Sequence, residues 1–72
     1  MVRFRMLEIT LNGASRRLEI ALSVAALLEL EGLAGKRVAV EKNGEIVPKS
    51  RHAEVILTAG DQLEIVVAVG GG

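Results

Sequence analysis

One short segment of helical periodicity lies between two stretches of strand periodicity, and this order most constrains the fold. In residues 24–31, apolar side chains recur every three or four positions, the spacing of one helix face. Strand-like alternation or continuous apolar sequence appears on both sides, in residues 6–11, 15–20, 38–41 and 62–69. A strand followed by a helix and another strand requires a crossover connection, which predicts parallel pairing in the sheet.

Turn and capping residues separate these segments. Asn12-Gly13 and Asn43-Gly44 predict hairpin turns, because both residue types tolerate positive φ. Ser23 is the expected N-cap of the helix, and Gly32 the expected left-handed residue after its end. Alternation turns these side chains toward the core: Leu7, Ile9, Leu11, Leu18, Ile20, Leu63, Ile65 and Val67.

The second half of the chain contains shorter elements. Residues 45–47 are a predicted return strand, which Pro48 ends because proline has no N–H to donate. Residues 49–52 are interpreted as a polar connection, residues 54–57 as a short strand and residues 59–61 as a turn.

The strand at 62–69 is the most hydrophobic and is therefore predicted to be central, between the first and third strands and parallel to the first. The predicted fold class is α+β, a mixed sheet of about five strands with one helix on one face, which is the β-grasp or ubiquitin-like architecture. We expect residues 1–72 to form a single domain, with residues 1–5 an N-terminal extension and residues 70–72 a flexible tail.

Composition excludes several classes of function. Nine basic and nine acidic residues give a net charge of zero, and Phe4 is the only aromatic residue, so no nucleic-acid partner is expected. Without cysteine the chain has no thiolate metal site or cysteine nucleophile and suits a reducing cytoplasm, its expected location. Apolar runs fall far short of the roughly 20 residues that span a bilayer, so no membrane association is expected.

The sequence shows no recognisable combination of catalytic residues. His52 is the only histidine, and we interpret it as a surface or partly packed side chain. Carboxylates fall at outward positions or turns, where solvation explains them: Glu8, Glu19, Glu41, Glu45, Glu54, Asp61 and Glu64. We therefore expect no metal site and no enzymatic activity.

The end of the sequence carries the distinctive chemistry. Gly70-Gly71-Gly72 directly follows the most hydrophobic strand, and glycines without Cβ atoms can thread a narrow channel. A carboxylate on Gly72 is a poor electrophile until it becomes a mixed anhydride, so a partner that holds ATP must activate it. A frayed terminus without function is the alternative explanation of such an end.

The root of this tail has a predicted docking surface. Alternation exposes an apolar patch on the sheet face away from the helix, formed by Val66, Ala68 and Ala39. Its expected polar rim consists of Glu64, Arg17 and Arg37.

Three blocks carry a family resemblance: residues 6–13, residues 38–50 with Asn-Gly-Glu-Ile-Val-Pro, and residues 60–72 with Gly-Asp followed by a hydrophobic strand and glycines. Over residues 6–72 the sequence resembles the ThiS family, the sulfur carriers of thiamin biosynthesis. The resemblance implies that an E1-like adenylyltransferase of the ThiF type adenylates Gly72 with ATP and Mg. Sulfur from a donor such as a cysteine desulfurase then gives a thiocarboxylate, which thiazole synthase of the ThiG type consumes.

Residues 1–5 precede the usual family start at Met6, and His52 stands where many family members have an aromatic residue. Two alternatives stay open. One is a sulfur carrier of the molybdopterin synthase small-subunit type, whose members are usually longer. The other is a non-covalent β-grasp interaction module, for which the tail would be dispensable.

Overall fold

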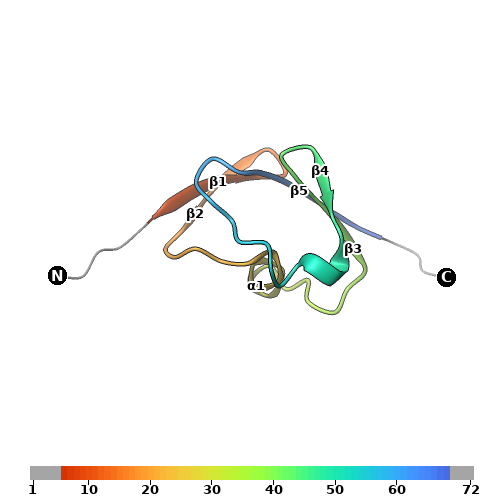
Figure 1. Ribbon diagram of the computed structural model, residues 1–72. Coiled ribbons are helices and arrows are strands. Elements are labelled where there is room, and N and C mark those ends of the chain that lie inside the picture. Colours follow the sequence, from red (N-terminus) through yellow and green to blue (C-terminus); the bar gives the residue numbers. More distant parts are fainter. Residues whose placement is uncertain (1–5, 69–72) are drawn as a thin grey trace.

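The computed structural model describes residues 6–68, which form a five-stranded mixed sheet with one α-helix against one face (Figure 1). The elements are β1 (Leu7–Leu11), β2 (Ala14–Leu18), α1 (Val24–Leu30), β3 (Val38–Lys42), β4 (Glu45–Val47), the 3₁₀ turn η1 (Lys49–Arg51) and β5 (Gln62–Val67). The strand order is β2-β1-β5-β3-β4. The predicted β-grasp architecture is confirmed.

The last strand is the centre of this sheet. β5 runs parallel to β1, with Thr10 opposite Gln62, and antiparallel to β3, with Ala39 opposite Val66. Both asparagine–glycine turns form as predicted, with φ of +50° at Asn12 and +54° at Asn43.

Helix α1 has the predicted caps at both ends. The Ser23 hydroxyl accepts a hydrogen bond from the Ala26 N–H at 3.0 Å. After the helix, Gly32 adopts a φ of +74°. The Leu33 N–H then donates to the Leu28 carbonyl at 2.8 Å, and the Gly32 N–H donates to the Glu29 carbonyl at 3.0 Å. This pair of bonds is the Schellman motif, which satisfies carbonyls that the helix itself leaves free.

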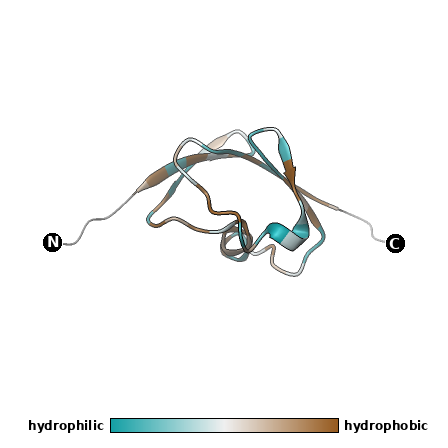
Figure 2. Cartoon of the chain, viewed as in Figure 1, coloured by the Kyte–Doolittle hydropathy of each residue, from teal (hydrophilic) through white to brown (hydrophobic). Residues whose placement is uncertain are grey.

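The core lies between α1 and the sheet, and the ribbon coloured by hydropathy shows apolar residues in both layers (Figure 2). It consists of Ile9, Leu11, Leu18, Val24, Leu27, Leu28, Val40, Val47, Leu57, Leu63 and Ile65. Two side chains predicted to face the core do not reach it. Ile20 is 63% exposed because β2 ends two residues before it, and Val67 is 38% exposed at the last position of β5.

The predicted strand at residues 54–57 is wrong. This segment makes a single isolated bridge, between Ser23 and Ile56. Its backbone bonds go to the chain leading into α1: the Val24 N–H donates to the Val55 carbonyl, and the Leu57 N–H to the Leu22 carbonyl. Leu57 is fully buried, so the segment covers one end of the core instead of extending the sheet.

Candidate functional site

The end of β5 and the neighbouring part of β3 expose apolar side chains on the sheet face opposite α1. Val66 is 64% exposed and lies directly opposite Ala39, which is also exposed. The pairing continues one residue beyond the strand, because the Ala68 N–H donates to the Arg37 carbonyl at 2.9 Å. The structure therefore brings Val66, Ala68, Ala39 and Arg37 together where β5 ends.

One apolar residue of this face was not anticipated. Ile46 in β4 is 64% exposed and pairs with Glu41, which in turn lies opposite Glu64. The alternation in β4 predicts that Ile46 faces outward, since the neighbouring Val47 faces inward. A strand of three residues is too short for this pattern to stand out in the sequence. We call Ala39, Ile46, Val66 and Ala68 the outer patch; Glu64 lies beside it, as predicted.

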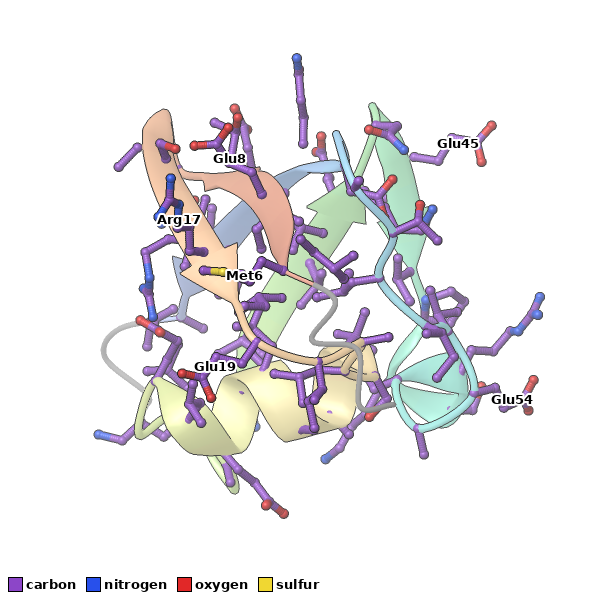
Figure 3. All side chains as sticks on the ribbon, turned by 90° about the vertical axis from the view of Figure 1, so that its left-hand side faces the viewer. Met6, Glu8, Arg17, Glu19, Glu45 and Glu54 are labelled. Atoms are coloured by element: carbon purple, nitrogen blue, oxygen red, sulfur yellow. The ribbon has the colours of Figure 1, made fainter. Side chains whose placement is uncertain are left out.

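Arg17 does not belong to the rim of the outer patch, contrary to the prediction. It pairs with Glu8 on β1, two positions before Thr10, whereas Val66 lies four positions beyond Gln62, the partner of Thr10. At about 3.3 Å per residue, the two side chains are roughly 20 Å apart along the strand direction. Figure 3 shows Arg17 and Glu8 at the β1–β2 side of the domain. Alternation gave the face correctly, but the register of the parallel pair decides the position.

The Asn12 side chain holds the middle of β5. Its Oδ1 accepts from the Ile65 N–H at 2.8 Å, and its Nδ2 donates to the Ile65 carbonyl at 3.2 Å. These bonds extend the β1–β5 pairing past the end of β1. Among the described residues, β5 is thereby held by both neighbouring strands at Ile65, and on the β3 side alone at Ala68. Gly70, Gly71 and Gly72, the predicted sulfur-carrying tail, lie outside the described residues.

Asp61 precedes β5 and is buried, so interpreting it as a solvated turn residue was wrong. Its carboxylate accepts from the Thr58 N–H at 2.8 Å and from Asn43 Nδ2 at 3.0 Å, with Lys42 Nζ at 3.8 Å. Burial alone would raise the pKa of Asp61, but the Thr58 and Asn43 hydrogen bonds and the Lys42 charge outweigh it, so the pKa is lowered. Asn43 in turn accepts from the Gln62 N–H, which joins the β3–β4 turn to the start of β5.

His52 is only 7% exposed, so of the two interpretations, surface or partly packed, the surface one is wrong and the side chain is packed. Its Nε2 lies 3.1 Å from the Val47 carbonyl oxygen, and because a carbonyl only accepts, the ring donates there. The bond ties η1 to β4.

Apart from the cross-strand pair Glu41 and Glu64, the carboxylates do not gather in one place. Glu8, Glu19, Glu45 and Glu54 project from different parts of the domain (Figure 3). Within residues 6–68, no three histidine or acidic side chains are placed to hold a metal ion. Over the same residues, no helix is long and apolar enough to cross a membrane.

Comparison with known proteins gives consistent similarities. A model of the ThiS family matches residues 9–72. Thiazole synthases from Paramagnetospirillum magneticum and Magnetococcus marinus are 46% and 36% identical over 66 residues, which are 92% of this chain and 20% of each relative. The chain thus spans about a fifth of the length of these two relatives.

Two smaller proteins match over most of their length. The sulfur carrier protein ThiS from Bacillus subtilis is 46% identical over 50 residues, covering 69% of this chain and 76% of that protein. The crystal structure of the thiamine biosynthesis protein ThiS from Geobacter metallireducens aligns with a TM-score of 0.78 at 29% identity, covering 92% of this chain and 100% of that one.

Proposed function

The chain belongs to the ThiS family, and from this premise we propose that it is a sulfur carrier for thiamin biosynthesis, a protein co-substrate rather than an enzyme. The observation that carries the proposal is the family match, which extends through Gly72. The β-grasp domain supports it, because β5 is central and is hydrogen-bonded up to Ile65 on the β1 side and up to Ala68, four residues before Gly72, on the β3 side.

The proposed chemistry takes place at one carboxylate. A free carboxylate on Gly72 attacks the α-phosphorus of Mg-bound ATP held by an adenylyltransferase of the ThiF type, and pyrophosphate leaves. Sulfide displaces AMP from the acyl adenylate; when a cysteine desulfurase is the donor, a thiol reductant supplies the two electrons that convert its persulfide sulfur to the sulfide level. The resulting thiocarboxylate donates its sulfur to thiazole synthase. Gly70 and Gly71 serve as the narrow arm that enters each partner's active site.

Thiazole synthase is the partner that the relatives favour. Two proteins of that name contain a segment similar to 92% of this chain, and that segment is 20% of each protein. Because these relatives carry the similar segment and the name thiazole synthase in one polypeptide, they support direct contact between this chain and a thiazole synthase. We propose that the outer patch is the docking surface, since it is apolar, has charged neighbours and adjoins the end of β5.

Mass spectrometry of the intact protein tests the proposal. After incubation with ATP, Mg, a ThiF-type adenylyltransferase and a sulfide donor, we expect one oxygen of Gly72 to be replaced by sulfur. The matched control lacks Gly71-Gly72 and should stay unmodified. An unmodified full-length protein, together with full activity of the shortened one, would instead favour a non-covalent interaction module.

The choice of pathway needs a second measurement. The thiocarboxylate form should support thiazole formation by thiazole synthase. Transfer to a molybdopterin synthase large subunit, without transfer to thiazole synthase, would favour the molybdopterin type of carrier.

A further inference from the structure

A groove on the helix side of the domain is separate from the outer patch. It has a volume of about 540 Å³, and its apolar floor includes Leu28, Leu33 and Val38. Ala25, Leu28 and Glu29 of α1 form one wall, and the connection to β3 forms another. The third wall is formed by Lys49, the first residue of η1, with His52 and Ala53; η1 is a hydrophilic turn in Figure 2.

The rim of this groove is basic. Lys36, Arg37 and Lys49 line it, against a single carboxylate from Glu29. All three cations are exposed, and within residues 6–68 none of them forms an ion pair. The whole chain has a net charge of zero, so this excess of positive charge is a local feature. Positive side chains around an apolar floor are complementary to a ligand with the opposite charge pattern.

The walls are held by backbone hydrogen bonds and do not depend on a ligand for their shape. The Ala25 N–H donates to the His52 carbonyl at 2.9 Å, which fixes η1 against α1. The Schellman bonds at the end of α1 fix Leu33 beside Leu28. Arg37 is fixed through its carbonyl, which accepts from Ala68. A preformed groove binds with a smaller loss of conformational entropy.

We propose that this groove binds an acidic peptide segment of a partner protein, with one or two apolar side chains on the Leu28–Leu33–Val38 floor and carboxylates against Lys36, Arg37 and Lys49. The groove is open and flanked by separate cations, which suits an extended segment better than one compact anion. The groove is on the helix side of the sheet, whereas the outer patch is on the opposite face; Arg37 lines the groove and also bonds Ala68 of the outer patch through its carbonyl. A protein held in the groove therefore leaves Val66 and Ile46 of the outer patch free. The inference does not depend on sulfur transfer.

A synthetic peptide tests the groove directly. The probe is a labelled peptide with a leucine–valine pair flanked by two aspartates on each side, titrated by fluorescence anisotropy and by amide NMR shifts. We expect shifts confined to the residues that line the groove, at 25, 28, 29, 33–38, 49, 52 and 53. The variant Lys36→Glu/Lys49→Glu should bind roughly tenfold more weakly, because two favourable charge contacts become repulsive.

A control variant with the same change in net charge distinguishes binding in the groove from general electrostatic attraction. Arg17→Glu/Arg51→Glu changes the net charge by the same amount but alters cations that do not line the groove, and it should bind within about twofold of the unmodified protein. The neutral variant Lys36→Ala/Lys49→Ala, with unfolding measured for each protein, guards against misfolding as the cause.

Several results would overturn the proposal. These are the absence of NMR shifts, shifts on the outer patch, or equal weakening by both charge-reversed variants. A peptide with serines in place of leucine and valine must bind more weakly, or the apolar floor has no role. Citrate binding to the same residues as tightly as the peptide would make the groove a small-anion site instead.

Discussion

The side-chain amide of Asn12 forms two hydrogen bonds with the backbone of Ile65, accepting from its N–H at 2.8 Å and donating to its carbonyl at 3.2 Å. These are the bonds that one more residue of β1 would otherwise make. Asn12 also adopts the positive φ of +50° that the β1–β2 turn requires. One residue thus closes the hairpin and extends the central parallel pairing toward the end of β5.

Replacing Asn12 with alanine should lower the free energy of unfolding by about 2 kcal/mol, roughly 1 for each lost hydrogen bond, with added strain at positive φ. Urea denaturation measures this loss. Asn12→Gly separates the lost hydrogen bonds from the backbone strain, because glycine adopts positive φ without strain but has no side-chain amide. A glycine variant as stable as the unmodified protein would show that the bonds to Ile65 contribute nothing.

Asp61 should make stability depend on pH on the acid side. Its pKa is lower in the folded state than in the unfolded chain, so ionised Asp61 stabilises the fold above its ordinary pKa. This contribution is lost as the pH falls through the lowered, folded pKa. We expect Asp61→Asn to cost about 1–3 kcal/mol at pH 7, because an amide brings a donor toward Thr58 and Asn43.

The measurement for Asp61 is urea denaturation repeated at several pH values. Below about pH 4, the difference in stability between the unmodified protein and Asp61→Asn should shrink. Glu45→Gln, at an exposed carboxylate, is the control. It should change neither the free energy of unfolding at pH 7 nor its dependence on pH. The same difference at every pH would contradict the assigned role of the Asp61 charge.

Local patterns in the sequence predicted most of the fold. Residue types alone predicted the turns at Asn12 and Asn43 and the cap at Ser23. The hydrophobicity of the last strand predicted its central place. The helical spacing left Leu30 and Glu31 as alternatives for the last position of the buried face. Leu30 is 64% exposed, whereas Glu31 is partly buried and its carboxylate pairs with Arg16 of β2.

The failures share a dependence on contacts between distant segments. Asp61 looks like a solvated turn residue until Asn43 and Lys42 are brought to it from the β3–β4 hairpin. His52 lies in a polar stretch, yet the Val47 carbonyl supplies its buried partner. Arg17 was assigned to the correct face, but the β1–β5 register separates it from the outer patch. The glycine tail lies outside the described residues, so its role stays a prediction.

Gly32→Ala tests the end of α1. The glycine has a φ of +74°, and a Cβ there would meet nothing within 4 Å, so only the backbone conformation opposes the change. We expect a loss of about 1 kcal/mol in the free energy of unfolding for alanine, and a smaller loss for Gly32→Asn. Urea denaturation of the two variants gives the comparison. Alanine tolerated as well as glycine, or better than asparagine, would contradict the left-handed cap.

Val66→Glu tests the outer patch as the docking surface. Val66 is 64% exposed, so a glutamate should change the free energy of unfolding by less than about 0.5 kcal/mol. A buried charge at the interface should nevertheless weaken binding to thiazole synthase about tenfold or more, measured by isothermal titration. Ile20→Glu is the matched control, because Ile20 is 63% exposed but lies outside the outer patch. Equal binding by both variants, or equal weakening, would mean that thiazole synthase docks elsewhere on the domain.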